Sequence, residues 1–353
     1  MREFNYSLIN DRTWDTEMLE LFSAIYKTTG RQEIFLKQKS QELEKLTDIA
    51  RIQSTQASNA LEGIRASNNR IKQLVADNAI PRNRNEELIS GYRDALEIIY
   101  ESYDAMPIVP NYIMLLHRIL FSHTNDSQAG KIKSIQTYID TNQSGKDSAY
   151  FTTASPLEAP VMLEQICSEY NRVIDHKEVD PLLAITVFIR DFLCINPFNE
   201  GNSRMSRLLL SLLLYKNGFL AGKYISLEAK IAENPELCRD VLFESMTGWH
   251  EGTDNPIPFI KYHLNILSSV CKDFEERFSL VEDKHSALET VQMAAQTLTG
   301  KFTKQDIRKL CPSLSISSIE GALRKMTESG ELIREGIGKS TTYYRSDKKN
   351  GTL

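Results

Sequence analysis

Apolar residues recur every three or four positions along most of the chain, the spacing that places them on one face of an α-helix. Residues 16–50 and 82–105 combine such a face with a heavily charged one, and residues 112–121 and 161–174 continue the pattern. Alternation of apolar and polar residues, the pattern of strands, is confined to two short places. We therefore expect an all-α fold with little β-structure.

The most apolar part of the chain, residues 182–195, has almost no polar position on any side of a helix. Such a helix belongs in the middle of a bundle, because no face of it suits water. Pro197 disfavours helical geometry at Asn196, so this helix should end there. A second buried helix is expected over 205–215. The loop 196–207 therefore lies between two core helices, which is a rigid platform for a site.

A β-hairpin is expected in one of the two places with alternating residues. Residues 131–139 read as an extended segment, and residues 150–153 can pair back to it across a turn. The turn, 141–148, is rich in Gly, Ser and Asp. This pattern is compatible with a plain surface hairpin and also with an element that docks a partner.

The C-terminal residues differ from the rest in both pattern and charge. Across 300–349, eleven Lys and Arg stand against six Asp and Glu, whereas the whole chain has a net charge of −5. One helix can start at 303–306, and Ser317–Glu320 matches a capping box for the next. Two short strands are expected at 332–334 and 341–345. Helix, turn, helix and a small β wing predict a winged helix-turn-helix domain.

The length of 353 residues allows two or three domains. The mild net charge commits the chain neither to nucleic acid nor to a membrane. No apolar run is long enough to span a bilayer, and the five scattered cysteines are typical of reduced thiols in a cytoplasmic protein without membrane contact. The expected domains are an N-terminal helical region (1–105), a core (106–270), a connecting helix (271–290) and the winged-helix domain (291–353).

The loop reads Asn-Pro-Phe-Asn-Glu-Gly-Asn-Ser-Arg-Met-Ser-Arg, which is unusual for the start of a structural helix. Arg204 and Arg207 fall where unpaired N–H groups already give the helix a partial positive charge. A turn at Gly201 and the carboxylate of Glu200 complete a set that suits an anion, most plausibly a phosphate chain with a metal ion. The alternative is an ordinary corner between helices with solvated arginines.

The same loop closely resembles the signature of the Fic (Fido) family, His-x-Phe-x-(Asp/Glu)-Gly-Asn-(Gly/Lys)-Arg-x-x-Arg. The matching positions are Phe198, Glu200, Gly201, Asn202, Arg204 and Arg207. Two positions depart from the pattern: Asn196 stands where the family has its histidine, and Ser203 stands where it has Gly or Lys.

The resemblance extends over roughly residues 20–265. The hairpin at 131–153 resembles the family's flap, which docks the target segment. Residues 57–65 resemble its inhibitory helix, (Ser/Thr)-x-x-x-Glu-(Gly/Asn), through Ser58, Glu62 and Gly63. That short pattern also describes a plain helix end capped by Gly63, with Glu62 solvated.

The resemblance implies AMP transfer from ATP to a hydroxyl of a target protein. Glu200 is the implied Mg²⁺ ligand, and Phe198 is the implied apolar anchor of the loop. The implied nucleotide-binding residues are Gly201, Asn202, Ser203, Arg204 and Arg207. Arginine forks suit phosphate oxygens, and a carboxylate suits Mg²⁺. A carboxylate of Glu62 on Arg207 would take the place of a γ-phosphate oxygen and inhibit the site.

Asn196 changes the chemistry that this site can perform. The family's histidine takes the proton from the attacking hydroxyl, whereas an amide has no basic lone pair near neutral pH. A positioned base is worth roughly 10²–10⁴ in rate. We therefore expect binding of ATP and Mg²⁺ with impaired AMP transfer, in a chain that resembles an adenylyltransferase but lacks the base.

The expected partner is a target protein with a Ser, Thr or Tyr hydroxyl. DNA, contacted through residues 291–349, and a second copy of the chain are the other partners considered. The alternative function is a non-catalytic nucleotide sensor that binds DNA through its winged helix. The candidate recognition helix at 317–326 offers only Arg324 and Lys325, toward its end, so a contact with protein is an equal alternative.

Overall fold

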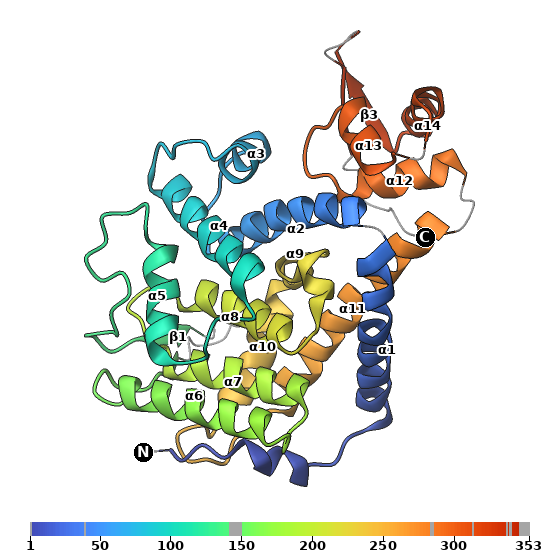
Figure 1. Cartoon of the computed structure of the whole chain (residues 1–353). Helices are drawn as coiled ribbons and strands as arrows, with labels where there is room; N and C mark the ends of the chain where they lie inside the picture. Colours follow the sequence, from blue (N-terminus) through green and yellow to red (C-terminus); the bar gives the residue numbers. More distant parts are fainter. Residues whose placement is uncertain are drawn as a thin grey trace.

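The computed structural model describes residues 2–38, 40–140, 150–282, 286–312, 314–336, 338 and 341–345. It confirms the expected fold class, a mostly helical protein with a short two-stranded hairpin (Figure 1). The helices of the main body are η1 (Tyr6–Asp11), α1 (Thr16–Gln38), α2 (Ser40–Ala60), α3 (Asn68–Ala76), α4 (Arg84–Ser102), α5 (Pro110–Leu120), α6 (Ala159–Asp175), α7 (Pro181–Ile195), α8 (Asn202–Lys216), η2 (Leu220–Lys223), α9 (Leu227–Glu233), α10 (Pro235–Met246) and α11 (Ile257–Glu282).

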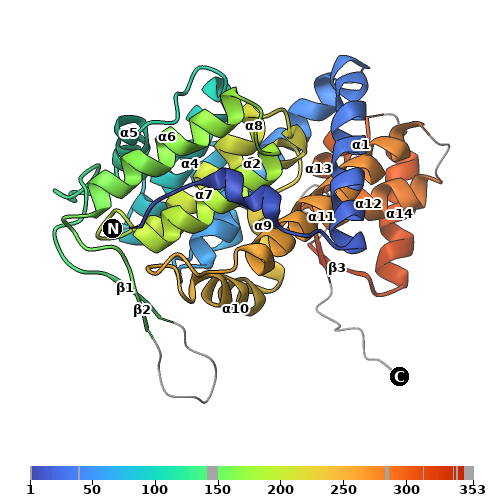
Figure 2. The ribbon, with the colours of Figure 1, turned by 90° about the horizontal axis from the view of Figure 1, so that it is seen from below.

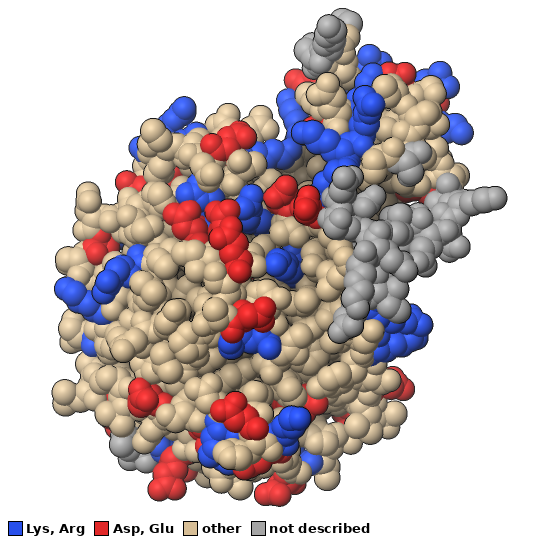
Figure 3. Space-filling view, viewed as in Figure 1, with Lys and Arg blue, Asp and Glu red and all other residues tan. Residues whose placement is uncertain are grey.

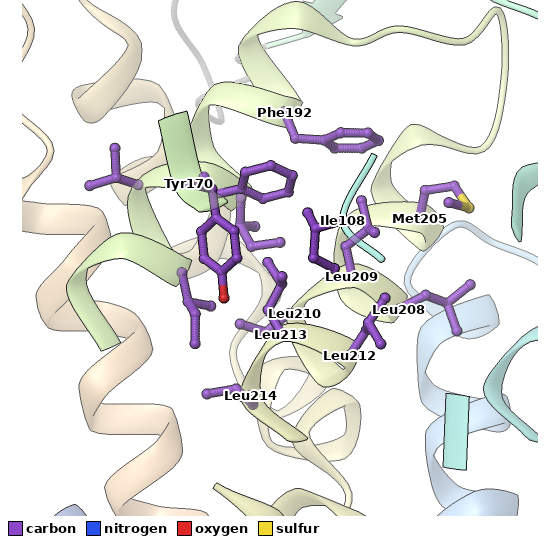
Figure 4. Packing of buried hydrophobic residues seen from close by; sticks show 14 of the residues in the cluster. Ile108, Tyr170, Phe192, Met205, Leu208, Leu209, Leu210, Leu212, Leu213 and Leu214 are labelled. Carbon is purple, nitrogen blue, oxygen red and sulfur yellow. The ribbon is translucent and has the colours of Figure 1, made fainter. Parts of the chain in front are cut away.

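Helices α7 and α8 form the centre of the bundle, as their apolar sequences predict. Every residue of α7 from Leu182 to Ile195 is buried. The helix starts cleanly, because the Asp180 side chain accepts from the N–H of Leu182 and Pro181 takes the first helical position. Figure 4 shows the leucines of α8 packed among Tyr170 and other buried side chains. Each fully buried side chain of this size contributes about 1.5–3 kcal/mol.

The two ends that flank the functional loop are set by residues with positive φ. Helix α7 ends at Ile195 as expected, and Asn196 adopts a left-handed conformation with φ of 51°. Helix α8 begins at Asn202 rather than at Met205, because Gly201, with φ of 85°, reverses the chain just before it. Arg204 therefore lies in the first turn of α8, and Arg207 (five residues after Asn202) lies in the second.

The N-terminal helical region contains more helices than the pattern indicated. The expected helix at 16–50 is divided between α1 and α2, which run in different directions (Figure 1). Helix α1 packs against α11, whereas α2 packs against α4 and α9. Helix α2 also continues to Ala60, so the residues after it approach the start of α8.

The hairpin projects from the main body (Figure 2). Its strands, β1 (Tyr138–Asp140) and β2 (Tyr150–Thr152), are antiparallel, with Tyr138 opposite Thr152 and Asp140 opposite Tyr150. Only the last part of the expected extended segment 131–139 forms a strand, because residues before it are tied to the functional loop. The expected turn at 141–148 lies outside the described residues.

The C-terminal unit, residues 287–345, has its own small apolar core. It consists of α12 (Ala287–Thr297), α13 (Lys304–Leu310), α14 (Ile316–Glu328), β3 (Leu332–Glu335) and β4 (Thr342–Arg345). Strands β3 and β4 pair antiparallel, and the buried cluster includes Phe302 and Leu323. Helix α14 is capped by Ser315, whose side chain accepts from the N–H of Ser318, so the capping box expected at Ser317–Glu320 does not form.

The connection between the two parts is a single long helix. Helix α11 runs from Ile257 to Glu282, across the expected boundary at 270. Cys271 and Phe274, in its second half, belong to the core of the main body, so the expected connecting helix 271–290 is not a separate element. Within the part of the chain that the structure describes, no helix is both long and apolar enough to cross a membrane.

Candidate nucleotide site

The loop between α7 and α8 is held in shape by the side chain of Asn202. Its Oδ1 accepts from the N–H of Phe198 at 2.9 Å, and its Nδ2 donates to the carbonyl of Phe198 at 2.7 Å. The same Nδ2 also donates to Oδ1 of Asn196. Both ends of this buried amide therefore bind the loop itself. Asn202 was expected to bind nucleotide, and its side-chain amide is engaged within the loop.

The loop is also held in place by His117 of α5. The ring of Phe198 is fully buried and stacks on His117, with ring centroids 3.8 Å apart. His117 Nδ1 accepts from the N–H of Gly130 at 2.8 Å, so the proton of the neutral ring lies on Nε2, which donates to the carbonyl of Glu200 at 2.9 Å. Burial lowers the pKa of His117 to about 4. A neutral imidazole thus holds the middle of the loop.

Lys133 connects the loop to the hairpin. Its buried ammonium donates to Thr137 Oγ1 at 3.0 Å, to Thr153 Oγ1 at 2.8 Å and to the carbonyl of Ile195 at 2.9 Å. Its backbone N–H donates to the carbonyl of Pro197 at 2.8 Å. The cation lies at the negative end of α7, where it is favoured, while burial lowers its pKa to about 8. The two strands are therefore fixed relative to the loop.

Glycine is required where the loop turns into α8. Gly201 has a positive φ, and a Cβ at this position would lie 2.8 Å from Cε2 of Phe121. As the residue before α8 it has no side chain to cap the helix, so among the described residues the first turn begins without a capping hydrogen bond from a side chain. Uncapped N–H groups at a helix start attract anions. Ser203 also lies in this turn, and its side chain, which carries a hydroxyl, does not interrupt the helix.

Arg204 is the most unusual residue of the site. It is 2% exposed, and its Nη1 is buried without a hydrogen-bond partner among the described residues. Its guanidinium lies 5.1 Å from the ring centre of Phe121, and burial lowers its pKa to about 10. A cation that stays charged at neutral pH is therefore buried with its Nη1 unpartnered among the described residues. An incoming anion would supply the acceptor that this donor lacks.

Arg207 is bound through Nε and Nη2 by the segment expected to be inhibitory. Its Nε donates to Ser58 Oγ at 2.8 Å, and its Nη2 donates to the carbonyl of Ser58 at 2.9 Å and to Glu62 Oε1 at 2.8 Å. Ser58 lies in the last turns of α2, and Gly63, with φ of 74°, ends the turn that follows. The structure thus brings Ser58, Glu62 and Arg207 together.

Glu200 is the carboxylate nearest to the start of α8. It is exposed and pairs with Arg84 at 3.3 Å, a distance typical of a weak surface ion pair. Among the described residues, no cluster of three or more His, Cys, Asp or Glu could hold a metal ion alone. One carboxylate together with substrate phosphates is a usual set of ligands for Mg²⁺. The residues therefore fit a metal that arrives with a nucleotide.

Asn196 lies at the end of α7 with its side chain toward the hairpin. Its Oδ1 accepts from Asn202 and, at 3.5 Å, from Thr137 Oγ1. An amide oxygen in this position can accept a hydrogen bond from a hydroxyl but cannot take its proton. The geometry therefore allows orientation of a hydroxyl without general-base catalysis by this residue.

Sequence reasoning missed two residues that shape the site. His117 and Lys133 are distant from the loop along the chain, and neither belongs to the matched signature. For Lys133 a signal existed, since it lies in the segment 131–153 that resembles the family's flap. For His117 there was none, because the spacing of the six histidines indicates no shared site.

Removal of the unpartnered cation should stabilise the fold. In Arg204→Met we expect the free energy of unfolding to rise by about 1 kcal/mol, because the cost of burying an unpaired charge disappears. Arg190→Met is the matched control: Arg190 is equally buried but pairs with Asp191 at 2.8 Å and with Asp254. Its loss should cost about 3–5 kcal/mol. Chemical denaturation measures both, and destabilisation of Arg204→Met would contradict the prediction.

The fold should weaken in acid through His117. Its pKa is about 4 in the folded state and about 6.5 when unfolded, so the unfolded chain binds more protons between these values. Stability is present above pH 6.5 and is lost as the pH falls toward 4, by about 3 kcal/mol for this group. His117→Gln should show a flatter dependence of unfolding free energy on pH in this window. An unchanged slope would show that His117 is not held neutral.

Comparison with known proteins identifies the loop and its surroundings. A profile of the Fic/DOC family matches residues 107–214, which include the whole loop, α7 and all of α8 except its last two residues. Protein adenylyltransferase fic-1 of Caenorhabditis briggsae is 29% identical over 109 residues, and that of Caenorhabditis elegans is 27% identical over 109 residues. These matches span 30% of this chain but only 19% of each relative's own length.

Solved structures share the fold over more of the chain. A Fic family protein from Desulfovibrio desulfuricans, 18% identical, superposes with a TM-score of 0.59 over 96% of this chain and 98% of its own. Fic-1 from Caenorhabditis elegans, 17% identical, gives 0.59 over 74% of this chain and 73% of its own. At these identities the likeness concerns the fold. The chain therefore contains a Fic/DOC domain, set in a helical fold that solved Fic proteins share.

Proposed function

We propose that this chain is a nucleotide-binding Fic protein of the adenylyltransferase type, inhibited by its own α2 segment and impaired in transfer by Asn196. The observation that carries the proposal is the buried Nη1 of Arg204, which lacks an acceptor beside an uncapped helix start. A buried donor without an acceptor calls for an explanation, and a bound anion would supply one. The similarity to protein adenylyltransferases supports ATP as this ligand.

The polyphosphate would lie against the first turns of α8. The backbone N–H groups of Asn202, Ser203 and Arg204 offer donors, and Gly201 supplies the positive φ that the turn before them requires. Arg204 supplies the charge-assisted bond that its Nη1 does not make within the fold. Donors that are already fixed by the loop need no reorganisation when an anion arrives.

Mg²⁺ would be held by Glu200 together with oxygens of the nucleotide. Its pair with Arg84 is exposed on both sides, with side-chain exposures of 59% and 52%, so water already competes for it. Exposed pairs of this kind are worth about 0–1 kcal/mol. The carboxylate is therefore available to a divalent cation. A bound Mg²⁺ would neutralise charge that develops on the transferring phosphoryl group.

The target would be a protein that presents a Ser, Thr or Tyr hydroxyl beside the hairpin. Lys133 fixes both strands relative to Asn196, so a segment docked on the hairpin would bring its hydroxyl to residue 196. Asn196 can orient that hydroxyl but leaves its proton without a base. Binding of ATP should consequently be retained while transfer is slow.

Inhibition follows from the competition for Arg207. Its guanidinium already binds two oxygens of Ser58 and one of Glu62, and its side chain is only 11% exposed. A γ-phosphate that needs the same donors must displace a carboxylate of equal charge sign. The ordering of the last turns of α2 would thus set how strongly ATP binds.

The alternative function is a nucleotide-sensing regulator that binds DNA. We propose that the C-terminal unit is a winged helix, formed by α12–α14 with β3 and β4 as the wing. Lys and Arg side chains gather on this unit (Figure 3), a charge pattern that favours contact with a phosphate backbone. On α14 itself, Arg324 and Lys325 are exposed but lie in its last turns, which favours DNA less than an early cation would.

Nucleotide binding is tested by calorimetric titration with ATP and Mg²⁺. We expect weak binding to the native chain and about tenfold tighter binding to Glu62→Gly, since loss of one charge-assisted bond is worth about 1.5–3 kcal/mol. Glu62→Gln should tighten binding by less, because it keeps the size of the side chain and removes only its charge. Arg204→Met is the negative control. Absence of heat in both native and Glu62→Gly proteins would refute the site.

Transfer is tested with ATP labelled in the α-phosphate. Asn196→His should label itself or added protein far more than the native chain, because a positioned base is worth roughly 10²–10⁴ in rate. The double variant Asn196→His/Glu62→Gly should label most, and Asn196→His/Arg204→Met should not label. If ATP binds but the double variant stays unlabelled, transfer is excluded. ATP-dependent retention on duplex DNA without label would then favour the regulator.

A further inference from the structure

The C-terminal unit rests against α2 and α3, the two helices on either side of the inhibitory segment 57–65. Helix α13 contacts α2, and α12 lies beside them (Figure 1). The proposed function assigns α2 the task of presenting Glu62 to Arg207. Contacts between α2 and a unit outside the Fic/DOC domain therefore bear on the state of the site.

The first of these contacts joins the two helices directly. Gln53 of α2 donates from Nε2 to the carbonyl of Thr297 at 2.8 Å. Thr297 is the last residue of α12, so its carbonyl has no partner within its own helix. The residue is also buried, with 3% of its surface exposed. Gln53 thus satisfies a buried acceptor of the C-terminal unit, and separation of the two would leave that acceptor exposed or unpaired.

The second contact needs a glycine in the C-terminal unit. Gly300, with φ of 71°, lies so close to Asn68 that a Cβ on it would be 2.8 Å from Cβ and 2.9 Å from Nδ2 of that residue. Asn68 in turn accepts from Gln56 of α2 at 2.7 Å. Lys72 of α3 donates to the carbonyl of Lys301 at 3.3 Å. Backbone of the C-terminal unit thus touches side chains that hold the last turns of α2.

Helix α2 can transmit these contacts to the arginine. Gln53 and Glu62 are nine residues apart, about 14 Å along a helix. Between them lie Gln56, which reaches Asn68, and Ser58, which binds Arg207. Ser54, on the same stretch, is tied to the main body through Ser226 at 2.8 Å. The last turns of α2 are thus held from two sides, by the main body and by the C-terminal unit.

We propose that the C-terminal unit acts as a latch on the inhibitory segment: its docking on Gln53 and Asn68 keeps Glu62 on Arg207, and its release frees the site. This deepens the proposed function and depends on it. The population of the inhibited state then follows the docking equilibrium, because docking and the Glu62 contact stabilise the same position of α2. An effector would act by binding the unit only when it is undocked.

The test compares substitutions that are matched in strain but differ in what they touch. Gly300→Ala places a Cβ against Asn68, whereas Gly330→Ala adds a Cβ at a similar φ, 78°, with nothing within 4 Å. Gln53→Met removes the donor to Thr297, whereas Gln292→Met removes a similar donor to Glu331 that stays inside the C-terminal unit. Gln53 lies outside that unit, so its replacement cannot unfold it directly.

Two measurements are made on each full-length variant: hydrogen exchange of the backbone amides in residues 54–62, and titration with ATP and Mg²⁺. We expect Gly300→Ala and Gln53→Met to speed exchange about tenfold and to raise ATP affinity toward that of Glu62→Gly. Gly330→Ala and Gln292→Met should leave both at native values.

The outcomes separate the latch from the proposed function. Native exchange and native affinity in both interface variants, while Glu62→Gly binds ATP more tightly, would overturn the latch and leave the site intact. Faster exchange in the interface variants without ATP binding to any protein, Glu62→Gly included, would support the docking and refute the nucleotide site. Equal effects of Gly300→Ala and Gly330→Ala would assign the change to strain and overturn the latch.

Discussion

A guanidinium with an unused donor inside the fold is the constraint on which the rest of the site depends. Arg204 is kept in place because α8 is packed on all sides, and Gly201 starts that helix without a capping side chain. The same features that make this position costly favour an anion, because a charged acceptor both accepts from the unused donor and offsets the buried positive charge. The surrounding loop is rigid for the same reason: Asn202 and His117 hold it so that the donors do not collapse onto the protein.

The two arginines of the signature, Arg204 and Arg207, differ in whether the fold supplies acceptors for their guanidinium groups. Nη1 of Arg204 has no acceptor among the described residues, whereas Arg207 already donates to two oxygens of Ser58 and one of Glu62. One arginine therefore favours ligand entry and the other opposes it. Because the opposing contacts come from a helix that also meets the C-terminal unit, the balance between the two depends on parts of the chain far from the phosphate position.

The sequence predicted the elements whose pattern is strong and local. Helix α7 was predictable because it is apolar on all sides, and the end of that helix was predictable from Pro197. The start of α8 was expected at Met205, whereas the helix begins at Asn202. The sequence did not show this because Gly201 turns the chain through its positive φ and offers no capping side chain as a signal.

Contacts between distant parts of the chain were not predictable in this way. The role of His117 rests on a backbone N–H of Gly130 and a backbone carbonyl of Glu200, which no side-chain motif records. The docking of Thr297 on α2 likewise uses a backbone carbonyl. The sequence did suggest the proximity of Glu62 to Arg207, but only through resemblance to a family in which that pairing occurs.

The left-handed conformation of Asn196 has a consequence for how this chain can change over generations. Few side chains with a Cβ tolerate positive φ, and Asn, Asp and His are the ones that do so most often. Asn and His are also related by a single base change in the genetic code. The backbone here therefore suits either residue, so a descendant could gain or lose a proton acceptor in one mutational step without rebuilding the loop.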